Sequence, residues 1–353
     1  MALSRAEGDV QTAPVRVHVT GAEGRLARRV LALLADDEHV VDGSATASDV
    51  VIHLGAGDHD RRARRRENVT DGVDAMLHDA TVGGARQIVL ISSALVYGAY
   101  ANNPIPLTED AVLRPDVEFV YARQLATVEA MVDRWRRDDP RRSVCVLRPV
   151  VAMAADGTPS LAAALAAGFG QRLGADDPPA QFLHLDDLAS AVVLAVDRRL
   201  DGVFNVAPDG WVAGERVRAL SGARPRVRLP DRMSAMVTAL RWRFQRGPIP
   251  PGLRSYTQQP WLVANDRLKA QGWTPTITNE QAYVEGTEAR WWTMITPKRR
   301  QELTLTGMGL LAAALAAGTF SLVPRGTTYT LQRRGRSGLV VLQTLTDTLC
   351  PGK

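Results

Sequence analysis

Cysteine is scarce in this sequence, and its scarcity removes two classes of site. Among 353 residues only Cys145 and Cys350 are cysteines. Two such distant cysteines build no disulfide framework and no cysteine-based metal site. The fold must therefore rest on a hydrophobic core, and a chain of this length can bury a large one. One large domain, or a domain with a smaller lobe, is expected.

The N-terminal segment lacks the apolar stretch of a secretory signal peptide. Residues from Met1 to Pro14 contain no long apolar run. We interpret residues 1–13 as a leader outside the fold, and we expect the large domain to stay in the cytoplasm.

Charge is not concentrated in one region. The net charge is +5, and the densest basic run, Arg61–Arg66, is interpreted as a solvated helix start or loop rather than a phosphate-binding patch. The sequence therefore does not predict nucleic-acid binding. No internal repeat or low-complexity linker interrupts the chain.

A glycine turn near the N-terminus is the first positive signal. Valines alternate with polar residues over Val15–Val19, which is typical of a strand. Gly21 and Gly24 follow and allow a tight turn, and from Arg25 the apolar residues take helical spacing. The N-terminus of a helix carries unpaired N–H groups and partial positive charge, and a dinucleotide pyrophosphate often binds there.

An aspartate follows the glycine turn at the spacing of a ribose-binding carboxylate. Asp42 ends a short strand candidate, His39–Gly43, about twenty residues past the turn, where it could accept a hydrogen bond from an adenosine ribose. This position favours NAD over NADP; an ordinary surface aspartate is the alternative. Only Ser44–Ser48 separates this strand from the next, whereas a parallel crossover needs a dozen or more residues. Either a strand–helix unit is missing, or His39–Asp42 is not the second strand.

Strand and helix patterns alternate along the chain, which predicts a doubly wound parallel sheet. The expected strands are Asp49–Leu54, Gln87–Ile91 and Ser143–Leu147, and the expected helices are Glu67–Thr81, Glu118–Arg137 and Leu188–Val196. Ligands of such sheets bind at the carboxyl ends of the strands. Thr20, Gly55, Ser93 and Arg148 should gather at that edge.

Together these segments resemble the extended short-chain dehydrogenase/reductases, the NAD-dependent epimerase/dehydratase group. The resemblance covers Val15 to Trp292 and rests on an ordered series of motifs: Thr20–Gly24, His53–Ala56, Asn68–Val69, Ser92–Gly98, Thr108–Asp110, Arg114–Pro115, Tyr121–Arg123, Leu147–Pro149, Phe182–Ala189, Val203–Ala207 and Leu268–Pro275. It implies a Rossmann-type fold and a nicotinamide cofactor, NAD before NADP. The implied cofactor-binding residues are Thr20, Gly21, Glu23, Gly24, Arg25, Leu26, Asp42, Leu54, Gly55, Ala56, Asn68, Tyr121, Leu125 and Arg148.

The resemblance also implies catalytic residues, and one of them is altered. Ser93 matches the family residue that polarises the reacting carbonyl or alcohol, and Tyr121 matches the phenol that transfers the proton. The family lysine four residues later, which binds the nicotinamide ribose and lowers the phenol pKa, is Leu125 here. Leucine supplies neither a charge nor a hydrogen bond.

Three interpretations of Leu125 stay open. The chain is a slow or atypical oxidoreductase, a nucleotide-binding regulatory or scaffold protein without turnover, or an enzyme in which another cation fills the gap. Arg148 is the nearest candidate cation by topology. The expected substrate is a sugar nucleotide or a related alcohol, and a homodimer is the assembly considered.

Other polar clusters are assigned structural roles. His184, Asp186 and Asp187 resemble a metal site, but such a segment in this family is a turn into a helix, so no metal is predicted. Glu109 and Asp110 are interpreted as loop residues.

The domain plan places the dinucleotide-binding domain at residues 14–209 and a substrate lobe at 210–297. In the lobe, arginines at 241, 243, 246 and 254 could meet a phosphate or be solvated. Residues 303–323, from Leu303 to Val323, carry no charge and are long enough for a transmembrane helix, with a buried apolar helix as the alternative. The tail, residues 324–353, shows no clear element.

Overall fold

The computed structural model describes residues 15–21, 24–37, 39–42, 48–55, 70–169, 177–221, 236, 251–287, 331–334 and 340–343. Only the backbone is described at Asp42, Asp71, Ser160 and Pro251 and in the last two ranges. The chain divides into two compact units, Met1–Ala289 and Arg290–Lys353. The first unit holds the sheet and the candidate site.

A parallel sheet of six strands forms the centre of the first unit. The strands are β1 (Arg16–Thr20), β2 (Val40–Asp42), β3 (Val50–His53), β4 (Gln87–Ile91), β5 (Ser143–Pro149) and β8 (Gly202–Val206), in the order β2-β1-β3-β4-β5-β8. Every pairing in this sheet is parallel. The predicted α/β class and parallel sheet are confirmed. The bounds of β4 are as expected, and those of the other predicted strands differ by at most two residues.

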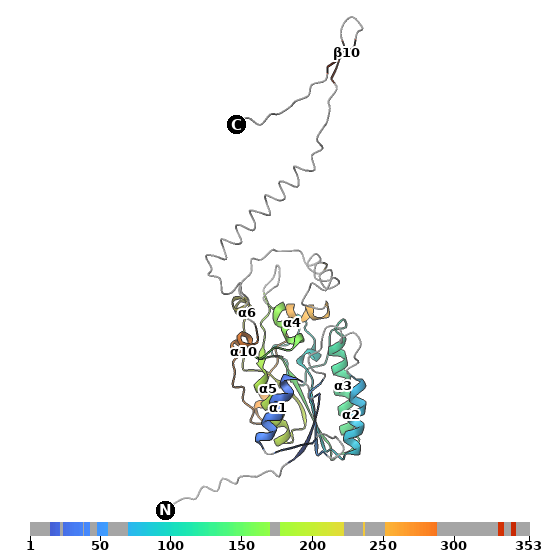
Figure 1. Cartoon of the computed structure of the whole chain (residues 1–353), viewed down its shortest axis with the longest axis vertical. Helices are drawn as coiled ribbons and strands as arrows, with labels where there is room; N and C mark the ends of the chain where they lie inside the picture. The colour runs from blue at the N-terminus through green and yellow to red at the C-terminus, as the bar shows by residue number, and fades with distance from the viewer. Residues whose placement is uncertain are drawn as a thin grey trace, which may run out of the picture. The chain divides into compact units, whose positions relative to one another are not determined.

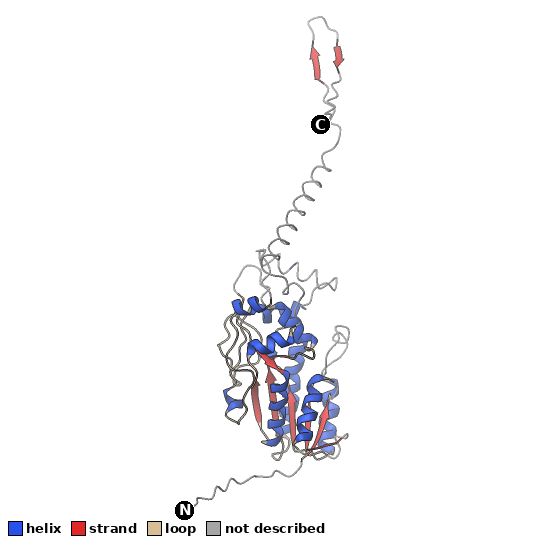
Figure 2. Cartoon of the chain, turned by 60° about the vertical axis from the view of Figure 1, so that its left-hand side comes forward, coloured by secondary structure: helices blue, strands red, loops and turns tan. Residues whose placement is uncertain are grey.

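Helices cover both faces of the sheet (Figure 1). One side carries α1 (Arg25–Asp36) and α5 (Leu185–Asp197), and the other carries α2 (Asp71–Val82) and α3 (Val120–Arg137). Figure 2 shows the same layering from a second direction. Helix α3 begins two residues later than expected because Phe119, in a non-helical conformation, is its N-cap.

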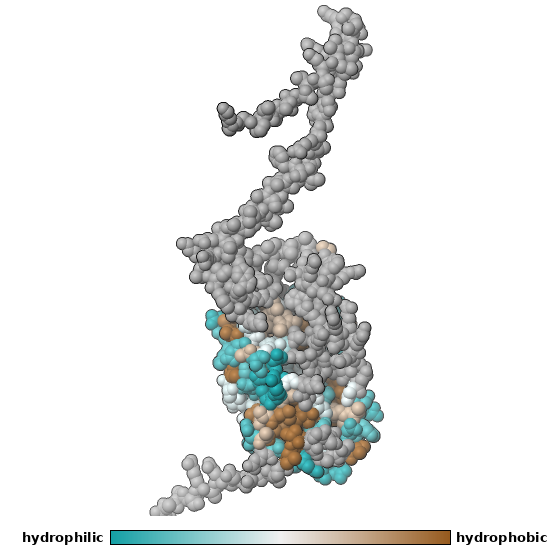
Figure 3. All heavy atoms as spheres, in the orientation of Figure 1, coloured by the Kyte–Doolittle hydropathy of each residue, from teal (hydrophilic) through white to brown (hydrophobic). Residues whose placement is uncertain are grey.

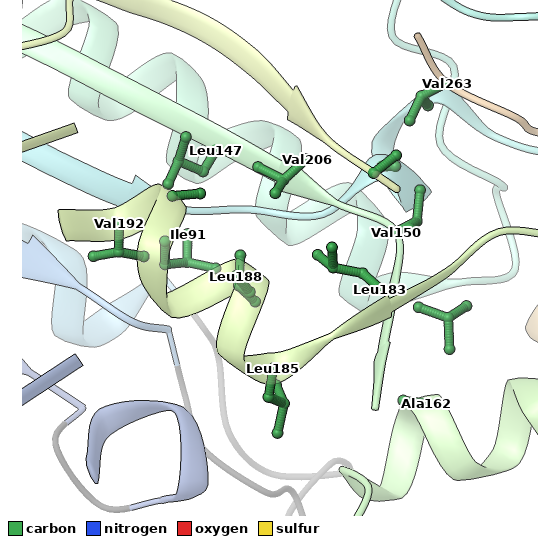
Figure 4. Packing of buried hydrophobic residues seen from close by; sticks show 14 of the residues in the cluster. Ile91, Leu147, Val150, Ala162, Leu183, Leu185, Leu188, Val192, Val206 and Val263 are labelled. Atoms are coloured by element: carbon green, nitrogen blue, oxygen red, sulfur yellow. The ribbon is translucent and has the colours of Figure 1, made fainter. Parts of the chain in front are cut away.

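The period-2 geometry of strands explains the two layers, since successive side chains point to opposite faces. Val89 and Ile91 of β4 belong to the core under α1 and α5, whereas Ile88 and Leu90 belong to the core under α2 and α3. Figure 4 shows Leu188 of α5 near Ile91. Both faces of the sheet are therefore buried, as an all-parallel sheet requires.

Strands β2 and β3 lie on opposite sides of β1. Val17 pairs with Val41 on one side and with Val50 on the other. Only residues 43–49 connect the two strands, too few for the usual crossover helix. Val40–Asp42 is therefore the second strand of the chain, and among the described residues no strand extends the sheet beyond β2.

The second half of the first unit adds short elements beside the carboxyl edge of the sheet. These are β6 (Val151–Met153), α4 (Ser160–Gly168), β7 (Phe182–His184), α6 (Gly214–Leu220), η4 (Pro251–Leu253), α8 (Arg254–Gln258), α9 (Asp266–Lys269) and α10 (Asn279–Gly286). Strand β6 pairs with β7 in parallel, and α4 and α10 pack on this pair. Of the predicted lobe, residues 222–235, 237–250 and 288–297 lie outside the described residues.

The second unit is described only in an antiparallel pair, β9 (Leu331–Arg334) and β10 (Val340–Gln343). The expectation that the tail holds no element is therefore wrong. Each alternating stretch is only four residues long, which is too short to predict a strand without knowledge of the strand that pairs with it. Within the described ranges no helix has the length and apolar character needed to cross a bilayer. The predicted transmembrane segment, Leu303–Val323, lies outside those ranges.

Most of the described surface in Figure 3 mixes hydrophilic and hydrophobic residues, with one hydrophobic patch low on the visible face. The exposed large apolar residues include Val40 and Val41 of the edge strand β2.

Candidate functional site

Two glycine turns touch at the carboxyl edge of the sheet. Gly21 follows β1 with a φ of 72°, and a Cβ added to it would lie 2.4 Å from the carbonyl oxygen of Gly55, which follows β3. Only glycine tolerates both that φ and that approach. Because β1 is the strand at which the sheet order reverses, these turns lie at the topological switch point, where α/β sheets bind ligands.

Helix α1 opens directly above this turn and has no side-chain cap. Its N-cap is Gly24, at a φ of 152°, and this glycine has no side chain that could cap the helix. No acidic residue lies in the first turn. The N–H groups of the first turn and the positive end of the helix dipole therefore favour an anion at this place.

Arginines of α1 join the turn to the loop after β6. Arg25 donates from Nε to the carbonyl oxygen of Asp156 at 2.8 Å. Arg29 binds the Asp156 carboxylate through two nitrogens, at 2.9 and 3.1 Å, and also contacts Asp186 at the start of α5. The predicted cofactor residue Arg25 thus lies at the turn, and its side chain is hydrogen-bonded to the loop after β6. Leu26 packs partly buried against the core.

Thr20 and His53 are register partners at the ends of β1 and β3. The Thr20 hydroxyl lies 2.7 Å from His53 Nδ1. Burial lowers the pKa of His53, so this imidazole is neutral near pH 7. The N–H of Leu54 donates to the Thr20 carbonyl at 3.2 Å, which fixes the strand ends beneath the two glycines.

Asp42 ends β2 opposite His18 of β1. It therefore lies on the strand beside the glycine turn, as the prediction of a ribose contact requires, although its side chain is not described. Glu23, Ala56 and Asn68, three further predicted cofactor residues, lie outside the described residues.

Ser93 and Tyr121 come from neighbouring segments past the end of β4. Ser93 is the N-cap of η3 (Ala94–Tyr97), and its hydroxyl accepts from the Leu95 N–H at 3.3 Å. Tyr121 lies in the first turn of α3 and is partly buried, with its ring 5.9 Å from that of Phe119. Helix α3 packs against η3, so the structure brings the two predicted catalytic segments together.

Leu125 lies one turn after Tyr121 on the buried face of α3. Its side chain is 2% exposed. Glu129 follows one turn later on the same face and is also buried. Residues spaced by four lie on one helix face, so Tyr121, Leu125 and Glu129 form a stripe toward the sheet.

Arg148 was the candidate for the cation that Leu125 does not provide, and Glu129 of this stripe binds it. Its Nη2 and Nε donate to Glu129 at 2.6 and 3.1 Å, and Nη1 donates to the Tyr97 hydroxyl at 2.7 Å. Burial alone would lower the pKa of Arg148, but the hydrogen bonds and charge of Glu129 outweigh it and raise the pKa. The guanidinium is therefore directed at Glu129 and Tyr97.

A buried polar network surrounds this pair. The Tyr97 hydroxyl donates to Asn205 Oδ1 at 2.8 Å, the Ser92 hydroxyl donates to Glu129, and the backbone N–H of Asn205 donates to Glu109 at 2.9 Å. Sequence reasoning missed Glu129 and Tyr97. One signal was available: an arginine in a buried strand needs a carboxylate, and Glu129 is on the buried face of the neighbouring helix.

The other polar clusters are structural in the described chain. His184 Nδ1 accepts from the Asp186 N–H as the N-cap of α5, and Asp187 accepts from the backbone of Thr276 and Ile277. Among the described residues no group of His, Cys, Asp and Glu is arranged to hold a metal ion. Asp110 pairs with Arg267 at 2.8 Å.

Comparisons with known proteins agree with this arrangement. The model of the NAD dependent epimerase/dehydratase family matches residues 16–207, more than half of the chain. Curated relatives include uncharacterized proteins of Mycobacterium bovis and Mycobacterium tuberculosis, each 27% identical over 169 residues. The match spans 46% of this chain and 44% of each relative, so the chain spans less than half the length of the curated relatives it matches.

Solved structures share the fold. The RMD protein of Pseudomonas aeruginosa in complex with NADPH is 20% identical, with a TM-score of 0.57, over 80% of this chain and 100% of that one. The Thermotoga maritima UDP-glucose 4-epimerase with UDP-glucose is 15% identical (TM-score 0.55), and the Thermus thermophilus UDP-glucose 4-epimerase with NAD is 16% identical (TM-score 0.53). Each of these two covers 77% of this chain and 97% of its own.

Proposed function

This chain belongs to the NAD dependent epimerase/dehydratase family, and from that premise we propose that it binds a nicotinamide dinucleotide and transfers hydride to or from a sugar nucleotide or a related alcohol. The observation that carries the proposal is the uncapped N-terminus of α1 above the touching turns of Gly21 and Gly55. Structural neighbours in complex with NAD, NADPH and UDP-glucose support these ligand classes.

The residues present fit a dinucleotide. At Gly24 an added Cβ meets no described atom within 4 Å, so there is room above the turn. The N–H groups of the first turn of α1 would bind the pyrophosphate, and Asp42 would accept from the adenosine ribose. A carboxylate there would repel a 2′-phosphate, so we propose NAD as the preferred form. Bound at this edge, the nicotinamide supplies the hydride chemistry.

Ser93 is suited to the substrate oxygen. Its hydroxyl accepts from the Leu95 N–H, so its own hydrogen is available to donate to a carbonyl or alkoxide. A fixed donor of this kind stabilises negative charge that develops on oxygen. Tyr121 would then exchange a proton with the same oxygen as a general acid or base.

Leu125 sets the expected rate. An unperturbed phenol titrates near 10, and a nearby cation is the usual means of lowering that pKa. Leu125 provides no cation, and the Arg148 guanidinium is bound to Glu129 and Tyr97. We therefore propose slow turnover at neutral pH.

The test compares two glycines in a titration with NADH followed by nicotinamide fluorescence. Gly24 and Gly202 both have positive φ, 152° and 117°, and both have open space at the Cβ position with respect to described atoms. Gly24→Val should abolish NADH binding. Gly202→Val, at the opposite end of the sheet, should preserve it. Binding of neither NADH nor NADPH to the wild-type chain would refute the proposal.

We also propose membrane association of the full-length chain through Leu303–Val323, with the large domain on the cytoplasmic side. The support is the uncharged run between basic flanks. The full-length chain should pellet with membranes, and a chain that ends near Lys298 should stay in the supernatant. Full-length protein in the supernatant would contradict the proposal. A homodimer stays a prediction.

A further inference from the structure

We propose that Tyr256 is a positioning residue that holds the segment after Ser93 against the start of the helix carrying Tyr121. This inference rests on the proposed roles of Ser93 and Tyr121. Tyr256 comes from the second half of the first unit, and none of the family motifs named above includes it.

The Tyr256 hydroxyl bridges the two segments. It donates to the carbonyl oxygen of Leu95 at 2.7 Å, and it accepts from the backbone N–H of Asp116 at 3.4 Å. The side chain is fully buried. Burial raises the pKa of Tyr256, so the hydroxyl keeps its proton and remains a donor. Leu95 lies two residues after Ser93, and Asp116 lies five residues before Tyr121.

Residues around Tyr256 strengthen the same contact. The Ser255 hydroxyl donates to Asp116 Oδ2 at 2.7 Å, and Asp116 Oδ1 accepts from the Glu118 N–H at 2.8 Å. The Tyr256 ring meets Phe119 edge-on, with centroids 5.7 Å apart. Phe119 in turn contacts Tyr121, so the entry into α3 is held from the side of α8.

Gly252 brings η4 against the same turn. A Cβ added at Gly252 would lie 2.7 Å from the Glu118 carbonyl oxygen and 2.9 Å from Phe119 Cα. Both atoms belong to the backbone and cannot rotate away. Substitution at this glycine must therefore separate η4 from the start of α3.

The two segments also meet directly, both where α3 packs against η3 and upstream of Tyr121. The Arg114 N–H donates to the Val96 carbonyl at 3.1 Å, and a Cβ at Gly98 would lie 2.1 Å from the Arg114 carbonyl oxygen. The Tyr256 hydroxyl adds a hydrogen-bonded bridge between Leu95 and Asp116, just before α3 begins. Because misplacement by about 1 Å can cost about 100-fold in rate, this contact matters for the Ser93–Tyr121 geometry.

The experiment uses the full chain labelled with 3-fluorotyrosine. The chain has six tyrosines, so ¹⁹F NMR resonances can be assigned with single Tyr→Phe variants. Tyr256→Phe keeps the ring and removes the hydroxyl, and Gly252→Ala disturbs the contact by a different route. Both should shift the Tyr121 resonance by more than its linewidth without changing the Kd for NADH. Tyr283→Phe, a tyrosine of α10 packed on Phe182, should leave the Tyr121 resonance in place.

An unchanged Tyr121 resonance in both Tyr256→Phe and Gly252→Ala would overturn the inference. The proposed function fails by a different result, namely no NADH binding to the wild-type chain and no effect of NADH on Tyr121. Ser255→Ala serves as a further variant if Tyr256→Phe does not fold. Where turnover of UDP-glucose with NAD is measurable, Tyr256→Phe should lower kcat by about 10- to 100-fold with an unchanged KM for NAD.

Discussion

Arg148 of β5 and Glu129 of α3 form a buried ion pair, with Nη2 2.6 Å from Oε2 and side chains that are 5% and 7% exposed. The pair lies one helical turn beyond Leu125. It binds a charged group of the sheet to the helix that carries Tyr121, and it joins Tyr97 and Asn205 to the same network.

Removing the carboxylate of this pair should be costly. Glu129→Gln leaves the Arg148 charge buried without its counter-charge, so we expect the free energy of unfolding to fall by about 3–5 kcal/mol. Asp133→Asn is the matched control, because Asp133 lies one turn later on α3 in exposed pairs with Arg136 and Arg137. We expect a loss of about 1 kcal/mol or less there. Urea denaturation measures both, and equal losses would contradict the prediction.

Leu125→Lys should restore the cation beside Tyr121. We expect faster hydride transfer, by up to about 10²- to 10⁴-fold, or at least tighter NAD binding. Tyr121→Phe should erase activity in both backgrounds. NADH formation from NAD with UDP-glucose as the probe gives the rates. Leu125→Met is the control because it keeps an apolar side chain of similar volume.

The same substitution should lower stability, since Leu125 is buried and an ammonium group loses hydration there. Rates must therefore be compared on protein shown to be folded. Brisk turnover by the native chain, unaffected by Leu125→Lys, would show that another group supplies the charge.

The contact between the two glycine turns can be tested by stability. Gly21 and Gly84 have nearly the same φ, 72° and 75°, but only Gly21 faces a close backbone atom. Alanine at either position carries the strain of positive φ, which costs about 1 kcal/mol or more. Gly21→Ala should lose more, because it must also push away the Gly55 carbonyl. Thermal or urea unfolding checks the difference, and similar losses would argue against a tight turn.

The lowered pKa of His53 predicts that the stability of the fold depends on pH. Burial lowers its folded-state pKa below the ordinary value of 6.5. Below pH 6.5 the unfolded chain binds a proton that the folded chain does not, so the free energy of unfolding falls as the pH drops toward the folded-state pKa. The slope is at most about 1.4 kcal/mol per pH unit.

His53→Asn removes this contribution and can still hydrogen-bond to Thr20. The difference in unfolding free energy between the wild type and the variant should be flat above neutral pH. It should shift in favour of the variant as the solution becomes more acidic. A difference that does not change with pH would mean that His53 titrates equally in both states.

The sequence by itself determined the α/β class, most strands of the sheet and the place of the glycine turn. These features depend on local patterns, since alternating or continuous β-branched runs make strands and Gly21 and Gly24 permit the turn. Family motifs identified Ser93 and Tyr121 as candidate site residues, and the packing of η3 on α3 brings their segments together. Their catalytic roles stay predictions.

Only the tertiary structure decided which elements lie side by side. Strands β2 and β3 pair with opposite sides of β1, and no local sequence pattern predicts which strands pair. Glu129 is paired with Arg148 because α3 packs on β5 with one particular rotation about its axis. Tyr256 hydrogen-bonds to Leu95 across 161 residues of sequence. Tertiary packing, not local propensity, brings α8 to the start of α3.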